Sequence, residues 1–221
     1  MKLRFAPTSP YVRKVTVLAM ETGLDDKIER VATATAPGTP HAELGKENPL
    51  NKVPCLLTDD GLVLYDSPVI CEYLDSLHGG RKWFPVGRPR WTALRQMALA
   101  DGMLDAALLR RYEGLRPEDE RSGDWDKAQK LKIDQALNAL EGEVKGFPDA
   151  AGAELTIGHV AIGCALGYLD FRFAPENWRG GRGRTWRSGS TACRSGRPWR
   201  RRCRPNPTMP VQPARPRCRG R

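Results

Sequence analysis

Several features that would point to particular protein classes are missing from this chain of 221 residues. No apolar run approaches the ~18 residues that a membrane-spanning helix needs. Pro7 also interrupts the N-terminus too early for the apolar region of a secretory signal. We therefore expect no membrane partner and a cytoplasmic location. No CxxC pair occurs and no Cys/His cluster has zinc spacing, so we expect reduced thiols and no bound metal.

Acidic residues and lysine are absent from residues 179–221, which contain fourteen Arg and therefore carry a charge of +14. The rest of the chain has 22 basic and 26 acidic residues, a net charge of −4. Any attraction to polyanions thus belongs to this basic tail alone. Because the tail has no RGG repeat and no regular spacing of Trp, we expect no specific nucleic-acid partner.

Strand and helix patterns alternate in residues 1–80. Two helix starts combine hydroxyl or acidic residues with Pro, at Thr8-Ser9-Pro10 and Asp66-Ser67-Pro68. The predicted elements are a strand at 2–5, a helix from Ser9 to a stop at Gly23, a strand at 27–32, a short helix at 41–46, a hairpin of 55–57 and 62–64, and a helix at 67–77. The order is βαβ, a further helix, then ββα.

After a linker at 81–89 the pattern is helical only, with apolar stripes in 91–112, 125–145 and 156–171. We therefore predict an α/β domain over residues 1–80, an all-α helical bundle over 90–178 and a basic tail over 179–221. The tail lacks apolar periodicity and is rich in Pro and Gly. It cannot bury enough apolar surface to offset the entropy of ordering, so we expect it to be disordered.

Three short segments of the α/β half carry groups suited to binding a small peptide. At the first, Ser9 lies where free backbone amides and the helix dipole favour negative charge. A hydroxyl there could stabilise the thiolate of a bound thiol, whose ordinary pKa is about 8.5. Plain N-capping is the alternative. Ser9 has no base near it in the sequence and is not expected to be a nucleophile.

The other two segments are Val53-Pro54, directly before a strand, and Asp66-Ser67, at a helix start. Sequence alone favours a trans bond before Pro54, since cis is only about 5–6% of such bonds. A cis bond would turn the Val53 backbone outward, where it could pair with an extended peptide. Asp66 and Ser67 offer a carboxylate, a hydroxyl and free amides that suit an amino-acid end, with capping again the alternative.

Together, Thr8 to Val15, Asn48 to Pro54 and Leu64 to Leu74 resemble the three N-terminal signatures of bacterial cytosolic glutathione S-transferases. Leu99 to Ala106 and Gly163 to Arg172 resemble the C-terminal domain of one bacterial branch, and the likeness covers about residues 1–178. The resemblance implies a thioredoxin-like N-terminal domain and an all-helical C-terminal domain. It also implies glutathione as cosubstrate, a small electrophile as second substrate, a role in detoxification and a homodimer.

The resemblance further assigns roles to individual residues. It implies that Ser9 is the catalytic hydrogen-bond donor to the glutathione sulfur, with Thr8 as the fallback donor, and that the bond before Pro54 is cis. The Val53 backbone would pair with the cysteinyl part of glutathione, and Lys52 would bind the glycyl carboxylate. Asp66 and Ser67 would hold the γ-glutamyl end. Asp101 would also bind glutathione, since it could reach across to the site of a second subunit.

Two positions bear on how far this resemblance extends. Some relatives carry Cys at the Ser9 position and perform thiol–disulfide chemistry, so Ser9 favours conjugation or peroxide reduction. His159, in Thr156-Ile157-Gly158-His159, stands where the family usually has a capping Asp. We expect this residue to weaken the helix start by ~0.5–2 kcal/mol, in a structural and not a catalytic role.

The basic tail is an anomaly for this family, which has one or two further packed helices there. Arg without Lys, with much Gly, Pro, Ala, Cys and Trp, is the composition that GC-rich DNA yields when read out of frame. Read one frame over, with free choice of synonymous codons, Thr185 to Arg200 can give LAQWFDGVSQRPSMA, which resembles the missing helix. We interpret the tail as the product of a frameshift near Arg179 to Arg184, which could leave the protein unstable or inactive.

Two other functions stay open at this point. A non-catalytic transferase-like module for protein contacts would share the fold, although the complete set of Ser9, Val53-Pro54 and Asp66-Ser67 argues against a dead site. Glutathione-dependent peroxidase or dehalogenase chemistry would use the same residues.

Overall fold

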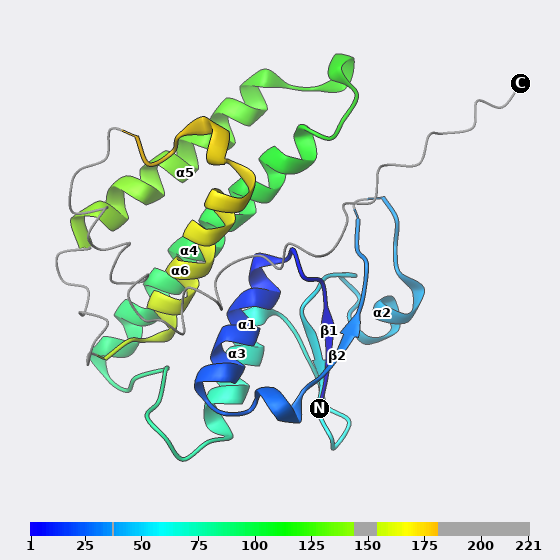
Figure 1. The fold of residues 1–221 in the computed structure, drawn as a ribbon, viewed down its shortest axis with the longest axis vertical. Coiled ribbons are helices and arrows are strands. Elements are labelled where there is room, and N and C mark those ends of the chain that lie inside the picture. Colours follow the sequence, from blue (N-terminus) through cyan, green and yellow to red (C-terminus); the bar gives the residue numbers. More distant parts are fainter. Residues whose placement is uncertain (37, 144–153, 181–221) are drawn as a thin grey trace, which may run out of the picture.

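The computed structural model describes residues 1–36, 38–143 and 154–180. Its N-terminal half contains a four-stranded mixed sheet in the order β2-β1-β3-β4 (Figure 1). β1 (Lys2–Phe5) pairs in parallel with β2 (Glu29–Ala32) and antiparallel with β3 (Cys55–Leu57), which pairs antiparallel with β4 (Val63–Leu64). β2 is shorter than predicted because Asp25–Lys27 form a 3-10 turn, η1.

Three helices complete this half: α1 (Pro10–Glu21), α2 (Ala42–Glu47) and α3 (Ser67–Ser76). α1 and α3 lie together on one face of the sheet, and α2 lies on the other (Figure 1). Leu18 of α1 and Ile70 of α3 are fully buried with Leu3 and Leu56 of the sheet. Burying each such side chain contributes about 1.5–3 kcal/mol, which holds the two helices against the strands.

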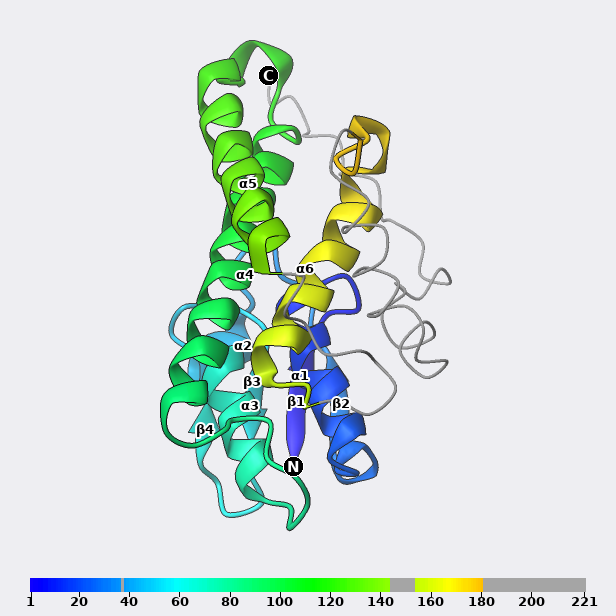
Figure 2. The same cartoon turned by 90° about the vertical axis from the view of Figure 1, so that its left-hand side faces the viewer.

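The helical half contains α4 (Arg88–Glu113), α5 (Gly123–Glu143) and α6 (Ile157–Arg172), with short 3-10 turns η2 (Glu118–Glu120) and η4 (Ala174–Glu176). α4 begins three residues earlier than predicted, because Pro89 fits the first turn of a helix. α4 and α6 run side by side next to α1 and α3, and α5 packs on the outer side of α4 (Figures 1 and 2).

The two halves share one continuous apolar core, which runs from Leu3 in β1 to Leu169 in α6. α6 approaches α4 closely at Gly158. A Cβ at this position would lie only 2.7 Å from the Gln96 side-chain oxygen and 2.8 Å from the Ala93 carbonyl oxygen. Glycine is therefore what allows α6 to pack this tightly against α4.

The start of α6 corrects the expectation for His159. Its Nδ1 accepts a hydrogen bond from the backbone N–H of Thr156 at 3.0 Å, so the imidazole supplies the acceptor that a capping box needs. Burial lowers the pKa of His159, and the nearby Arg81 charge lowers it further, while Glu143 raises it. The neutral imidazole, which has an acceptor nitrogen, is therefore favoured, and His159 caps α6 instead of weakening it.

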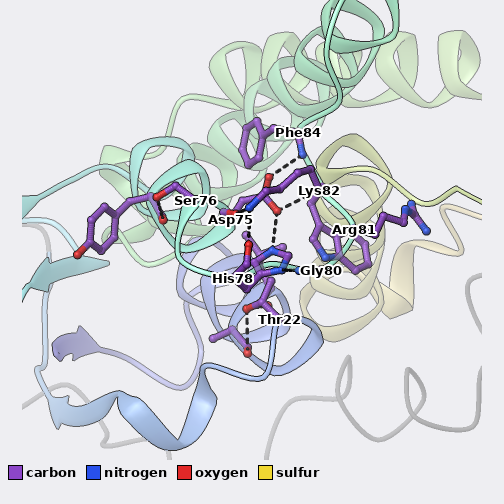
Figure 3. Close-up of polar contacts among 12 residues, drawn as sticks. Thr22, Asp75, Ser76, His78, Gly80, Arg81, Lys82 and Phe84 are labelled. Atoms are coloured by element: carbon purple, nitrogen blue, oxygen red, sulfur yellow. Dashed lines mark hydrogen bonds and ion pairs between the residues drawn. The ribbon is translucent and has the colours of Figure 1, made fainter.

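Asp75, at the end of α3, fastens the linker to the N-terminal half (Figure 3). Its buried carboxylate accepts the backbone N–H of Trp83 at 2.8 Å and that of Phe84 at 3.1 Å. His78 Nδ1 accepts the N–H of Gly80 at 3.1 Å, so the ring proton lies on Nε2 and is donated to Asp75 at 3.0 Å. This network fixes how the chain leaves α3 and enters the helical half.

The basic tail begins within the described part of the chain and continues beyond it. Arg179 binds Asp170 at 2.8 Å and stacks on the Trp178 ring at 4.1 Å. The disorder predicted for residues 179–221 is therefore not seen at Arg179. Residues 181–221 lie outside the described residues, so for them both the disorder and the frameshift interpretation stay predictions. Within the described ranges, no helix is long and apolar enough to span a bilayer.

Candidate active site

The sheet topology brings the three predicted binding segments to one edge of the sheet. Ser9 follows the carboxyl end of β1, Val53-Pro54 precede β3, and Asp66 follows β4. β3 runs antiparallel to both β1 and β4. The β3–β4 register, continued past the strand ends, sets Pro54 opposite Asp66. Ser9, more than 40 residues before the other two segments in the chain, therefore meets them at one place.

Ser9 is the N-cap of α1. Its Oγ accepts a hydrogen bond from the backbone N–H of Val12 at 3.3 Å. The oxygen of this hydroxyl therefore caps the helix, as the capping alternative predicted. A hydroxyl also has one donor, which the cap does not use. Thr8, the predicted fallback donor, is exposed one residue earlier. Both hydroxyls lie beside the positive end of the α1 dipole.

Two asparagines shape the loop that leads into β3. Buried Asn48 donates from Nδ2 to the carbonyl of Lys52 at 2.9 Å and accepts the N–H of Leu50 at 3.0 Å. Asn51 adopts a left-handed backbone conformation with φ of 55° and binds both backbone groups of His41. These contacts position the Lys52 backbone, while its side chain is exposed.

The Val53–Pro54 bond is cis, as the resemblance implied and contrary to the expectation from sequence alone. Within the part of the chain that the structure describes, no group hydrogen-bonds the backbone of Val53. A backbone N–H and C=O without protein partners bind water or a ligand. Half-buried Val53 thus offers both groups to a molecule at this edge of the sheet.

Asp66 and Ser67 begin α3 after a second cis bond, Tyr65–Asp66. Asp66 occupies the N-cap position, but its side chain makes no capping bond, so the capping alternative is wrong for this carboxylate. The Asp66 side chain is exposed and Ser67 is buried. A solvent-facing carboxylate therefore lies next to the free amides of the first turn of α3.

Asp101 of α4, which is partly buried, forms an ion pair with the buried Lys14 of α1. The Lys14 Nζ lies 2.8 Å from Oδ1 and 2.6 Å from Oδ2, and Lys14 is only 1% exposed. Burial raises the pKa of Asp101, Lys14 opposes that rise, and the negative charge of Asp66 adds to it. Lys14 thus holds Asp101 within its own chain, and the reach of Asp101 toward a second subunit stays a prediction.

Tyr11 of α1 makes a second contact with α4, one turn along from the ion pair. Its hydroxyl donates to Asp105, and burial together with this bond raises the pKa of Tyr11, so the phenol stays protonated. Sequence reasoning missed Tyr11, Asp105 and Lys14. One signal was present: Lys14 stands four residues before Leu18, on the apolar stripe of α1, where a lysine needs a partner.

Two cysteines in the described part of the chain, Cys55 and Cys71, have a raised pKa. Cys55, Cys71 and Cys164 are buried and form no disulfide. Burial raises the pKa of Cys55 to about 11 and that of Cys71 to about 12, so neither forms a thiolate near neutral pH. Among the described residues, no group of three or more His, Cys, Asp and Glu is arranged to hold a metal ion.

Comparison with known proteins gives matches to two family models. Residues 8–77 match the N-terminal domain of glutathione S-transferases, and residues 96–194 match their C-terminal domain. The second match runs past residue 178, where the sequence analysis placed the end of the likeness.

Individual relatives agree with these matches. The uncharacterized GST-like protein YibF of Escherichia coli K12 is 35% identical over 180 residues, which make up 80% of this chain and 86% of that protein. A glutathione transferase family member from Pseudomonas fluorescens Pf-5, solved with bound glutathione, is 40% identical with a TM-score of 0.84, over 93% of this chain and 98% of that chain. A glutathione S-transferase from Methylobacillus flagellatus KT, solved with glutathione bound, is 30% identical with a TM-score of 0.80, over 92% and 98% of the two chains. The chain therefore belongs to the glutathione S-transferase family.

Proposed function

We propose that this chain is a glutathione transferase, which binds glutathione at the sheet edge beside Ser9 and activates its sulfur for attack on a small electrophile. The observation that carries the proposal is the position of Ser9. Its O–H donor lies at the positive end of α1 and remains available while the hydroxyl oxygen caps the helix. Two similar structures that hold glutathione support the choice of ligand.

Ser9 lowers the pKa of the bound thiol by donating a hydrogen bond to its ionised form. The thiol proton passes to solvent, and the hydroxyl and the α1 dipole hold the thiolate. The sulfur electron pair then forms a C–S bond to an electrophilic carbon, and the leaving group departs with the electrons of the bond that breaks. Thr8, exposed at the same helix end, is the alternative donor.

The other contacts follow from the chemistry of the tripeptide. The Val53 backbone pairs with the cysteinyl unit as an added strand would. Lys52 binds the glycyl carboxylate through its exposed ammonium group. At the other end, Asp66 binds the γ-glutamyl ammonium, and Ser67 with the first amides of α3 binds its carboxylate. In a homodimer, Asp101 would contribute to the glutathione site of the second subunit.

We also propose that the protein is a homodimer. Val69 on α3 is 45% exposed and Trp91 on α4 is 69% exposed. The ion pair of Glu72 and Arg90, at 2.5 Å, joins the same stretches of α3 and α4. Large apolar side chains therefore share one surface, which a second copy would cover. Sedimentation should show a dimer that Val69→Glu combined with Trp91→Glu converts to a monomer, and a monomeric unmodified chain would contradict it.

Retention on immobilised glutathione and titration calorimetry test the binding step. Release of chloride from 1-chloro-2,4-dinitrobenzene, with formation of the glutathione conjugate, tests the chemistry. A chain that binds no glutathione would be a non-catalytic module, and faster turnover of a hydroperoxide or a haloalkane would reassign the reaction. Because the cytosol keeps glutathione reduced, we place this conjugation there, as a detoxifying reaction.

A further inference from the structure

Two arginines near the C-terminal ends of α4 and α6 have no acidic partner. Among the residues that the structure describes, no carboxylate pairs with Arg111 or Arg172, and the buried Nε of Arg172 has no hydrogen-bond partner. Arg110, the neighbour of Arg111, instead binds Asp126 at 2.9 Å and Glu176 at 3.0 Å. The two unpaired arginines therefore differ from those that stabilise this end of the bundle.

The ends of α4 and α6 that carry Arg111 and Arg172 are adjacent, because Arg110 of α4 binds Glu176, just after α6, and stacks on the Phe173 ring. Burial raises the pKa of Tyr168, and the charges of Arg172 and Arg111 oppose that rise. Burial lowers the pKa of Arg172, and the charge of Arg111 lowers it further. An anion bound between two like charges would relieve their repulsion.

This cluster adjoins the Ser9 end of α1. α4 and α6 both continue past the N-terminal end of α1 (Figure 1). Tyr11, two residues after Ser9, binds Asp105 of α4, and the pKa of Tyr11 is also raised by Tyr168. α6 also packs against α1, and Tyr168 of α6 precedes Arg172 by one turn.

We propose that Arg172 and Arg111 recognise an anionic group on the second substrate, so that the electrophile carries a carboxylate or a group of similar charge. The inference rests on the proposed function, because it places the electrophile between the sulfur at Ser9 and these arginines. The Phe171 ring lies 4.0 Å from the Arg172 guanidinium and orients its planar donors. A guanidinium matches a carboxylate through two parallel hydrogen bonds, which would satisfy donors that this fold leaves unpaired.

The test compares 3,5-dinitrobenzoate with 1,3-dinitrobenzene, two inert ligands of similar shape that differ in charge. Each is titrated by calorimetry into the full chain loaded with glutathione. We expect the benzoate to bind at least about tenfold more tightly, because hydrogen bonds to charged groups are strong. Arg172→Met should abolish this preference, and Arg172→Lys should retain part of it. Arg179→Met is the matched control, since Arg179 is already bound to Asp170, and it should keep the full preference.

Equal affinity of the unmodified chain for the two ligands would overturn the inference, as would an undiminished preference in Arg172→Met. A variant that loses both ligands equally, with a lower melting temperature, would show that Arg172 only stabilises the end of α6, and that result also overturns the inference. In each of these cases glutathione still binds and the proposed function stands. Failure to bind glutathione removes the proposed function as well.

Discussion

Lys14 and Asp101 form an ion pair that joins α1 of the N-terminal half to α4 of the helical half, with both carboxylate oxygens within 2.8 Å of Nζ. One turn away, Tyr11 donates to Asp105 across the same two helices. These contacts determine how the sheet edge that carries Ser9 faces the helices beside it. They therefore position the site, although neither pair is required for the chemistry at the sulfur.

Lys14→Met should destabilise the protein by about 3–5 kcal/mol, because it leaves the Asp101 carboxylate partly buried without a counter-ion. The double variant Lys14→Met/Asp101→Leu should regain most of this loss, since it removes both charges. Urea unfolding followed by circular dichroism measures the three free energies. An equal loss in the single and double variants would show that the buried carboxylate is not the cause.

Ser9→Ala should lower kcat/KM for 1-chloro-2,4-dinitrobenzene by roughly 10²-fold, because it removes a donor to developing negative charge. The pKa of the bound thiol, read from the pH dependence of the rate, should rise toward ~8.5. Ser9→Thr keeps a hydroxyl and serves as the control, and Thr8→Ala should have a small effect. Unchanged turnover in both alanine variants would remove the proposed mechanism.

Because His159 caps α6, the free energy of unfolding should decrease as the pH falls below 6.5, the ordinary pKa of a histidine. The pKa of His159 is lower in the folded chain than in the unfolded chain, so the unfolded chain takes up the proton first as the pH falls. The stabilisation that is present above pH 6.5 is therefore lost as the pH falls through the folded-state pKa. His159→Ala should lose ~0.5–2 kcal/mol at neutral pH. His159→Asp should retain the cap and remove this contribution to the pH dependence. Melting temperatures between pH 5 and 8 measure both effects, and identical pH profiles for His159→Asp and the unmodified chain would contradict the assignment.

Asp75→Ala should destabilise the protein by several kcal/mol, because it leaves the N–H groups of Trp83 and Phe84 buried without acceptors, at about 1–3 kcal/mol each. Ser76→Ala is the matched control on the same helix. Ser76 is exposed and its hydroxyl donates to the carbonyl of Tyr73 within α3, so its loss should cost no more than ~1 kcal/mol. Thermal unfolding compares the two variants, and similar melting temperatures would show that Asp75 does not hold the linker.

The sequence by itself determined the local elements and the residues at their ends. Ser9 followed by Pro10 predicted where α1 begins, and the apolar repeat that contains Leu18 predicted which face it buries. These properties depend on backbone caps and on spacing within a few turns, so neighbours along the chain decide them. The motifs also indicated the glutathione S-transferase family and a glutathione site, and the matches to two family models confirm the family.

Only the tertiary structure decided which distant groups meet. Lys14 and Asp101 are 87 residues apart, and no local pattern assigns one to the other. The capping role of His159 depended on the conformation of its ring, and the adjacency of the helix ends that carry Arg111 and Arg172 depended on how α4 and α6 pack. The physical reason is that a buried charge or donor finds its partner in space, through the packing of helices, and the sequence records only the order of residues along the chain.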